Sequence, residues 1–346
     1  MRSVNIQTKK RQGDQTRTPF GFHWLLFALV FAAAALQVSP STAAHDGGPV
    51  SPTPSGLVDV DDTDVTGGTP PEETVVRLVY ERGGVGPDVT QFYRLIEPVN
   101  TDHDTGLEPE FPLKAVVVLF TGGSGRLGFT DTSTGRGLTS SNFVIRQRMA
   151  FAASGPFVVA ISDAARDFHD EDESAPPCST GRGLRSCRLS TEHLTDVANL
   201  VQDLKARFPS LPVWLVGTSR GTISAAAAAA RLDNIDPANG DGLVLTATLT
   251  ASSVHRDVFD PDAQLGLIDV PTLIASHVDD SCITTPPSDR FALAAALVAA
   301  PEVAVKLFNS GYGAISDECD PLGPHGFFGV EAKVIKKIAR FINNNI

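Results

Sequence analysis

Continuous apolar runs and regularly spaced apolar positions divide residues 74–346 into a series of expected strands and helices. Runs such as 115–120 (AVVVLF) and 157–161 (FVVAI) contain no polar position, which is typical of strands covered on both faces. Residues 191–208 instead repeat their apolar positions at helical spacing. The expected strands are residues 75–80, 89–96, 115–120, 157–161, 213–216, 243–249, 271–277 and 304–308. The expected helices are residues 142–153, 191–208, 222–231, 290–299 and 329–342.

This order of elements predicts the fold class. Strands that alternate with helices favour an α/β domain with a mostly parallel, doubly wound sheet and helices on both faces. About twenty residues separate the strands 243–249 and 271–277, so a large cap domain is not expected between them. Residues 163–189 form a long polar stretch, which we interpret as a functional loop or a covering flap.

The stretch at residues 211–231, LPVWLVGTSRGTISAAAAAAR, joins an apolar strand to an Ala-rich helix through a sharp turn. The turn has the pattern G-x-S-x-G, with Ser219 between Gly217 and Gly221. A strained strand-to-helix turn needs small residues two positions either side of the nucleophile, whose hydroxyl then lies at the carboxyl end of the sheet. We therefore expect Ser219 to be exposed to a site there; a glycine-rich turn with an incidental serine is the alternative.

A second glycine-rich turn follows the strand 115–120 and reads Thr121-Gly122-Gly123-Ser124-Gly125. Its glycines allow the backbone to direct N–H groups toward a neighbouring site, although a tight strand-to-helix turn would use the same residues. A phosphate-binding loop is not expected, because no Lys-Ser/Thr pair follows at the required spacing.

Acidic and basic candidates follow the serine in chain order. Asp279 and Asp280 come directly after the expected strand 271–277, and His325 lies in a loop before the last helix. A serine hydroxyl becomes nucleophilic when a base lies within hydrogen-bond reach and a carboxylate orients that base. The order Ser, Asp, His is the one expected for this type of elbow.

The other histidines have ordinary structural interpretations. We expect His193 to be an exposed helix residue, His277 to be packed and hydrogen-bonded, and His169 and His255 to lie in loops. No two histidines have zinc-like spacing, so the sequence predicts no metal site.

The N-terminal residues 1–44 have the pattern of a signal peptide. A basic segment precedes the apolar run 24–36, which is too short for a membrane span, and small residues follow it. We expect cleavage after Ala43 or Ala44; an uncleaved anchor is the alternative. Residues 45–73 are rich in Pro, Gly, Asp, Ser and Thr and are expected to form a disordered linker, so the folded domain is expected at residues 74–346.

The net charge of the chain argues against a polyanionic partner. Removing a leader of net charge +4 from a chain of net charge −12 leaves −16. So acidic a protein is not expected to bind nucleic acid, and neutral or cationic substrates are weakly favoured.

The four cysteines, Cys178, Cys187, Cys282 and Cys319, are an even number in a chain with an export-type leader. Such a set favours two disulfides over a metal site, and three pairings are possible. A bond between Cys178 and Cys187 would close a small local loop and leave Cys282 to pair with Cys319.

The G-x-S-x-G turn, the strand-end pair Asp279-Asp280 and His325 before the final helix together resemble the α/β-hydrolase superfamily, from about Val75 to the C-terminus. The resemblance implies Ser219 as nucleophile, His325 as general base and acid, and Asp280, in preference to Asp279, as the acid.

It also implies an oxyanion hole formed by the N–H of Arg220 and by a donor from the turn after residues 115–120, where Gly122, Gly123 and Ser124 are the candidates and Gly123 and Ser124 are preferred. The sequence Thr-Gly-Gly-Ser-Gly replaces the His-Gly-Gly-Gly of lipases in this turn.

The sequence therefore predicts a secreted or periplasmic serine hydrolase that cleaves a small-molecule acyl substrate, namely a carboxylic ester, or else a thioester or amide. No organic cofactor, metal or stable membrane span after signal cleavage is expected, and the oligomeric state stays open. A peptidase or polyester depolymerase is an alternative within the enzymes, and a non-catalytic binding protein on the same scaffold is the alternative outside them.

Overall fold

The computed structural model of the 346-residue chain describes residues 72–82, 88–98, 112–130, 141–168, 183–232, 241–252 and 256–346. All of them belong to one compact unit that spans residues 63–346. The expected leader and the linker up to residue 71 lie outside the described residues. The first strand begins at Glu72, two residues before the expected start of the folded domain, so the last two residues assigned to the linker are part of the sheet.

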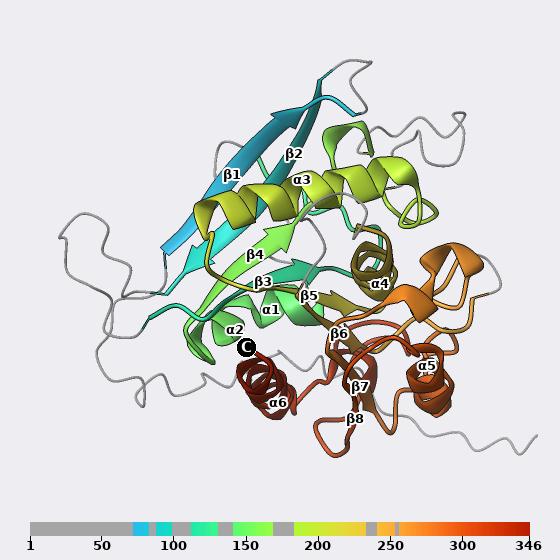
Figure 1. Cartoon of the computed structure of the whole chain (residues 1–346). Coiled ribbons are helices and arrows are strands. Elements are labelled where there is room, and N and C mark those ends of the chain that lie inside the picture. Colours follow the sequence, from blue (N-terminus) through green and yellow to red (C-terminus); the bar gives the residue numbers. More distant parts are fainter. Residues whose placement is uncertain are drawn as a thin grey trace, which may run out of the picture. The chain divides into compact units, whose positions relative to one another are not determined.

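One eight-stranded sheet organises this unit (Figure 1). Its strands are β1 (Glu72–Tyr80), β2 (Val89–Glu97), β3 (Ala115–Phe120), β4 (Phe157–Ser162), β5 (Val213–Thr218), β6 (Gly242–Thr246), β7 (Thr272–His277) and β8 (Val303–Phe308). Across the sheet they follow the order β1-β2-β4-β3-β5-β6-β7-β8. Strand β2 pairs antiparallel with β1 and β4, and all the other pairs are parallel. The expected mostly parallel α/β sheet is confirmed.

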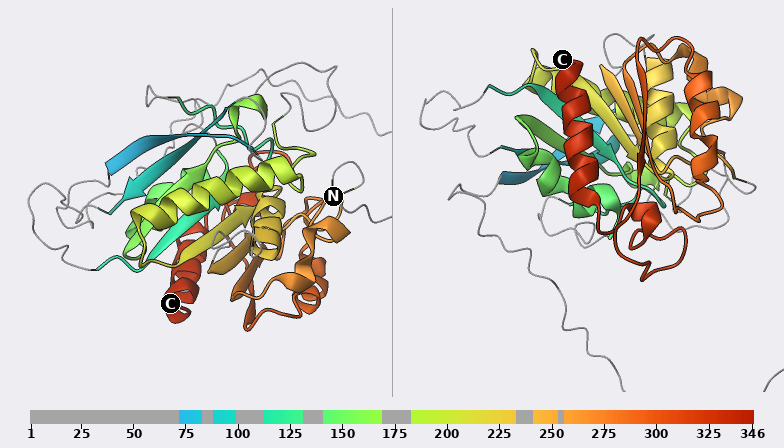
Figure 2. Two further views of the ribbon diagram at one scale, coloured as in Figure 1. Left: turned by 45° about the horizontal axis from the view of Figure 1, so that its top comes forward. Right: turned by 90° about the horizontal axis from the view of Figure 1, so that it is seen from below.

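Helices cover both faces of the sheet (Figure 2). The helices are α1 (Phe143–Arg146), α2 (Arg148–Ala153), α3 (Thr191–Arg207), α4 (Gly221–Arg231), α5 (Arg290–Ala296) and α6 (Glu331–Asn344). Side chains of α3, α4 and α5 share one hydrophobic core with the sheet, and side chains of α1, α2 and α6 share the other. Parallel strands end at the same edge of such a sheet, which brings the loops after β3, β5, β7 and β8 together.

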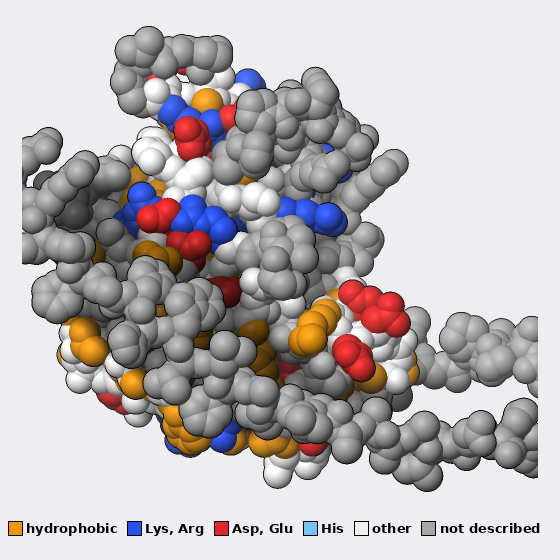
Figure 3. Space-filling model, turned by 90° about the vertical axis from the view of Figure 1, so that its right-hand side faces the viewer, with side chains coloured by type: hydrophobic (Ala, Val, Ile, Leu, Met, Phe, Trp, Pro, Cys, Tyr) orange, Lys and Arg blue, Asp and Glu red, His pale blue; other side chains and the backbone are white. Residues whose placement is uncertain are grey.

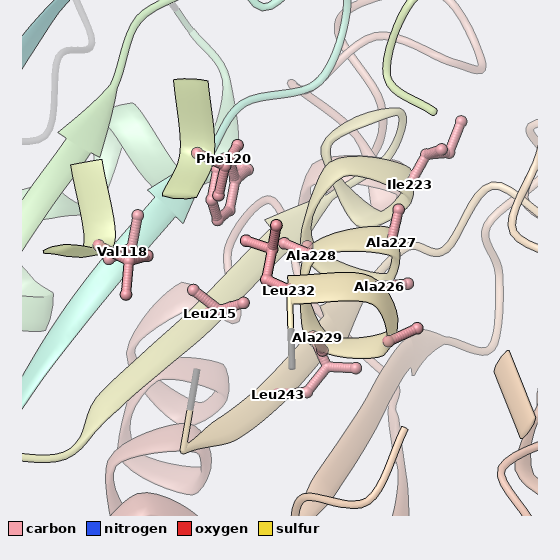
Figure 4. Close-up of a cluster of buried hydrophobic side chains, with 14 of the residues drawn as sticks. Val118, Phe120, Leu215, Ile223, Ala226, Ala227, Ala228, Ala229, Leu232 and Leu243 are labelled. Carbon is pink, nitrogen blue, oxygen red and sulfur yellow. The ribbon is translucent and has the colours of Figure 1, made fainter. Parts of the chain in front are cut away.

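The alanine-rich helix α4 is packed into the first core (Figure 4). All residues from Gly221 to Ala230 are buried, and the labelled side chains of Ala228 and Ala229 lie on the side of the helix that faces Leu215 and Leu243 of the sheet. Alanine is a strong helix former with a small side chain, so the helix forms readily and its axis approaches the strands closely. This packing fixes the helix whose N-terminus follows Ser219.

Three elements differ from the sequence-based expectation. The helix expected at 142–153 is divided at Gln147, whose φ of −102° and ψ of 10° end α1 before α2 begins. The strand expected at 243–249 ends at Thr246, because Ala247 adopts a positive φ of 43° and leaves the extended conformation. The helix expected at 290–299 ends at Ala296.

On the side of the molecule drawn in Figure 3, described acidic and basic side chains lie next to one another. Ion pairs among the described residues are of this mixed kind, for example Arg256 with Asp260.

Candidate active site

Ser219 occupies a strained turn between β5 and α4. Its φ of +52° lies in the left-handed region, which residues with a side chain rarely adopt. The strain is held by the surrounding backbone, since the N–H of Ser219 donates to Thr246 O at 3.0 Å and Thr222 N–H donates to Ser219 O at 3.0 Å. The local structure is the sharp strand-to-helix elbow that the sequence predicted.

Two glycines make this elbow possible. A Cβ atom on Gly221 would lie 2.1 Å from the carbonyl oxygen of Phe120 in β3. A Cβ on Gly217 would lie 2.6 Å from the carbonyl oxygen of Gly221. The elbow therefore needs glycine at these two positions because backbone approaches backbone, which is a stronger requirement than conformational freedom alone.

The loops after β7 and β8 bring Asp280 and His325 into contact. Asp280 Oδ2 lies 3.1 Å from His325 Nδ1, and the two residues are 6% and 5% exposed. Thr285 Oγ1 donates to Asp280 Oδ2 at 2.9 Å, and the N–H of Cys282 donates to Oδ1 at 3.0 Å. Both carboxylate oxygens are thus hydrogen-bonded, which fixes the carboxylate against the imidazole.

Asp279 does not take part in this arrangement. Its side chain is 70% exposed, and its Oδ2 lies 3.9 Å from Nδ1 of His277. The N–H of Asp279 also donates to that nitrogen, at 3.1 Å. Of the two adjacent aspartates, only Asp280 faces His325.

A tight loop holds His325 in place. It lies in a 3-10 turn, Pro324–Gly326, that ends at Phe327 with a positive φ of 59°. Arg146 of α1 donates to the carbonyl oxygen of Gly326 at 3.0 Å and pairs with Glu331 of α6 at 2.8 Å. The histidine loop is therefore tied to two helices on the opposite side from α4.

A disulfide joins the two loops that carry Asp280 and His325. The bond connects Cys282 with Cys319 at a sequence separation of 37 residues. Cys282 lies two residues after Asp280, and Cys319 belongs to the pocket wall beside Ser219. Of the other two cysteines, Cys187 is disulfide-bonded, whereas Cys178 lies outside the described residues, so their pairing stays a prediction.

Ser219 and His325 line the same pocket, which has a volume of about 280 Å³. Its wall comes from the turn after β3, the start of α1, the elbow and the histidine loop. Within the described part of the chain no hydrogen bond links the two side chains directly. Hydrogen bonds between a nucleophile and its base are often long in ligand-free structures and shorten when substrate is bound.

The glycine turn after β3 contacts the elbow. A Cβ atom on Gly122 would lie 3.0 Å from Ser219 Cβ, so the turn passes directly beside the serine. Gly123 and Ser124 line the pocket with it, and Arg220 is the N-cap residue of α4. Among the described residues, no acceptor pairs with the N–H groups of Gly123, Ser124 or Arg220. Burial, followed by repulsion from Arg185, lowers the pKa of the Arg220 guanidinium.

Two buried charged residues behind the glycine turn had no signal in the sequence. Asp163, after β4, accepts the N–H groups of Leu127 at 2.6 Å and Phe129 at 2.9 Å. Arg188 is the second, and it belongs to the polar stretch that we interpreted as a flap. The described end of that stretch packs behind the turn after β3: the N–H of Leu184 donates to Ser124 O at 2.7 Å.

The expectation that His193 is exposed is wrong. It is 2% exposed in α3, and its Nε2 lies 2.9 Å from Ser224 Oγ of α4. The apolar spacing of α3 had placed it at the margin of the buried face, where the contact with α4 covers it. His277 is packed and hydrogen-bonded to Ser310 O at 2.8 Å, as expected. His169 and His255 lie outside the described residues.

The described residues contain no group of three or more His, Cys, Asp or Glu side chains that could hold a metal ion. Over the same residues, every helix is too short or too polar to cross a bilayer.

Comparisons with known proteins give likenesses of structure alone. A scan against protein-family models finds no match, and no curated protein matches in sequence. Among solved structures, a soluble variant of monoglyceride lipase from Saccharomyces cerevisiae is 12% identical, with a TM-score of 0.49 and coverage of 80% of this chain and 96% of that one.

A thermostable esterase from Pseudomonas putida is 12% identical, with a TM-score of 0.49 and coverage of 80% and 84%. One of two esterases from Rhizomucor miehei is 13% identical, with a TM-score of 0.48 and coverage of 82% and 86%.

Proposed function

We propose that this chain, which has the α/β-hydrolase fold, is a serine hydrolase that cleaves carboxylic esters. One observation carries the proposal. Ser219, at the strained elbow, lines the same pocket as His325. Nδ1 of His325 lies 3.1 Å from the buried carboxylate of Asp280. A buried carboxylate on Nδ1 holds the imidazole in the tautomer that leaves Nε2 free to accept a proton.

In the proposed reaction, Ser219 Oγ attacks the ester carbonyl carbon, and its proton passes to Nε2 of His325. Asp280 stabilises the imidazolium that forms. The negative charge on the carbonyl oxygen is stabilised by N–H groups of Arg220 and of Gly123 or Ser124, which have no other acceptor in the described chain. His325 then gives its proton to the leaving alkoxide. Water then attacks the acyl-enzyme while His325 takes its proton. His325 returns this proton to Ser219 Oγ as the bond to the acyl group breaks and the acid is released.

The glycine turn is the part of the site that suits charge stabilisation. Donors that are fixed before the reaction stabilise developing charge without reorganising, and each is worth on the order of 10²-fold to 10³-fold in rate. The turn lies beside Ser219, and the carbonyl groups of residues 121–124 accept hydrogen bonds from Arg188 and from the N–H groups of Gly125 and Leu184. Thioesters and amides present the same carbonyl geometry and are secondary candidates.

Hydrolysis of p-nitrophenyl acyl esters by the purified protein tests this function. We expect turnover that Ser219→Ala abolishes while its circular dichroism spectrum stays unchanged. A series from acetate to palmitate, with a peptide p-nitroanilide and a polyester film beside it, separates an esterase from a peptidase or depolymerase. A folded wild-type protein that turns over none of these substrates would instead identify a non-catalytic binding protein.

We infer further that the protein is exported. The support is the signal-type pattern of residues 1–44 and the Cys282–Cys319 disulfide, a bond that persists in oxidising compartments. N-terminal sequencing of the protein from culture medium or periplasm tests this, with a mature start after Ala43 or Ala44 as the expected result. Recovery of the full-length chain in the cytosol would contradict it.

A further inference from the structure

Arg188 is a buried cation that has no counter-ion among the described residues. It is 2% exposed, and its partners in the described part of the chain include no carboxylate. Its Nε has no hydrogen-bond partner within the part of the chain that the structure describes. Burial of a charge that has no opposite charge beside it is unfavourable, so a guanidinium in this position calls for a role that offsets that cost.

The guanidinium binds the back of the glycine turn. Nη2 donates to Thr121 O at 2.9 Å and to Gly123 O at 3.3 Å, and Nη1 donates to Ser224 Oγ at 2.7 Å. The turn is shaped around it, since a Cβ on Gly125 would lie 2.9 Å from Nη2. Arg188 therefore joins α4, which begins at the elbow, to both sides of the Gly122–Gly123 peptide.

The described neighbouring side chains carry no charge that compensates the guanidinium. Arg188 can only donate, so Ser224 Oγ accepts from it, and the same oxygen lies 2.9 Å from Nε2 of His193. Burial, with added repulsion from Arg188 and Arg82, lowers the pKa of His193 to about 3, so this imidazole is neutral. Burial and the nearby Arg220 lower the pKa of Arg188 to about 9, which leaves the guanidinium charged at neutral pH.

These contacts set the direction of the N–H groups in the turn. In a trans peptide the N–H and the C=O point in opposite directions. The carbonyls of Thr121 and Gly123 point to Arg188, the carbonyl of Gly122 accepts Gly125 N–H at 3.2 Å, and that of Ser124 accepts Leu184 N–H at 2.7 Å. Because these carbonyl groups point to their donors, the N–H group of each of the same peptides points the opposite way. The turn that carries these N–H groups lines the pocket beside Ser219.

We propose that Arg188 is a positioning residue for the oxyanion hole. It aligns the Thr121–Gly122 and Gly123–Ser124 peptides, whose carbonyl groups it binds, and its charge, transmitted through these two peptide dipoles, stabilises the negative oxygen of the tetrahedral intermediate. This inference rests on the proposed ester hydrolysis. It explains why a cation is retained in a buried position with no anion among its described neighbours: the anion forms transiently on the other side of the turn during the reaction.

Three variants test the role: Arg188→Met, Arg188→Lys and the control Arg231→Met. Arg231 also donates to backbone carbonyls, those of Leu189 at 2.9 Å and Asp262 at 3.4 Å, but in the last turn of α4. For each protein, kcat and KM are measured with a p-nitrophenyl ester together with the Kd of an alkylboronic acid, which forms a tetrahedral anionic adduct with the serine. Thermal melting is recorded in parallel.

We expect Arg188→Met to lower kcat about 10²-fold and to raise the boronic acid Kd in parallel, with KM changed by about twofold or less. Arg188→Lys keeps the charge but not the planar fork, so its loss of kcat is smaller. Arg231→Met is expected to change neither value. A purely structural role would lower the melting temperature without this selective loss of kcat and boronate affinity.

A folded Arg188→Met variant with the wild-type kcat and boronate Kd overturns the inference while ester hydrolysis by the wild type stands. If Arg188→Met does not fold, the lysine variant decides: an unchanged kcat with a lowered melting temperature also overturns it. A wild-type protein that neither hydrolyses the ester nor binds the boronic acid overturns the proposed function and this inference together. In the first outcome, by contrast, the wild type is active and only the role of Arg188 is overturned.

Discussion

Asp280 Oδ2 lies 3.1 Å from Nδ1 of His325, although the two residues are 45 positions apart in the chain. The preceding residue, Asp279, points into solvent with a side chain that is 70% exposed. Two adjacent residues of one type therefore have opposite environments. The turn that follows β7 produces the difference, because Cys282 N–H and Thr285 Oγ1 both bind the carboxylate of Asp280.

This difference predicts unequal effects of the same substitution. Asp280→Asn should lower kcat on the order of 10⁴-fold, because the amide presents a donor to Nδ1 and favours the wrong imidazole tautomer. Asp279→Asn should change kcat by less than about threefold, since its side chain is mostly solvated. Steady-state kinetics of the two variants check this, and comparable losses in both would contradict the assignment of Asp280.

The Cys282–Cys319 bond should support activity in addition to stabilising the fold. It closes 37 residues between the two loops, and its removal should lower the free energy of unfolding by about 4 kcal/mol. We expect the double variant Cys282→Ala/Cys319→Ala to lose activity at temperatures below its own melting transition. In the wild type, activity should fall at a lower reductant dose than the melting temperature does. Loss of both at one dose would show that the bond acts only on stability.

The elbow predicts a stability difference between two glycines. Gly221→Ala would place a Cβ 2.1 Å from a backbone carbonyl that cannot move aside, so it should destabilise the fold by more than about 3 kcal/mol. Gly266→Ala is the matched control, because its nearest neighbour would be Val298 Cγ2 at 3.7 Å, and it should cost less than about 1 kcal/mol. Urea unfolding of both variants measures the difference. Equal stabilities would mean that β3 and the elbow do not approach as described.

His193 should make the fold sensitive to acid. Burial lowers its folded-state pKa to about 3, below the ordinary unfolded value of about 6.5, so its contribution is present above pH 6.5 and is lost as the pH falls toward 3. Between pH 7 and pH 5 this loss amounts to about 2 kcal/mol. The free energy of unfolding, measured in urea at both pH values, should therefore fall by about 2 kcal/mol less in His193→Gln than in the wild type. Asp196, whose pKa burial raises to about 6, contributes with the opposite sign to both proteins and cancels in the comparison.

Much of the architecture could be predicted because it depends on local patterns. Buried strands such as β3 and β5 are uninterrupted apolar runs, and the G-x-S-x-G turn between β5 and α4 needs its residues at fixed positions. Element ends were less predictable. Strand β6 ends at Thr246 because Ala247 turns to a positive φ beside the elbow, an effect of tertiary structure that a run of apolar letters does not contain.

The candidate site could be predicted from the sequence only where chemistry and chain order coincide. Ser219, Asp280 and His325 follow strands or precede the last helix in an order that the sequence displays. Arg188 gave no signal, because it is one of three arginines in residues 182–188, and a polar stretch of this kind has the composition of a solvated loop. Its burial results from packing of residues 183–190 behind the turn after β3, a contact between segments more than 60 residues apart in the chain.

Intact-mass measurement after treatment with a fluorophosphonate tests the central claim most directly, because the reagent modifies a serine only when a neighbouring base activates it. We predict one adduct, mapped to Ser219, that is absent in Ser219→Ala and forms far more slowly in a folded His325→Gln variant. An adduct on another serine, or equal labelling rates for the wild type and His325→Gln, would contradict the account.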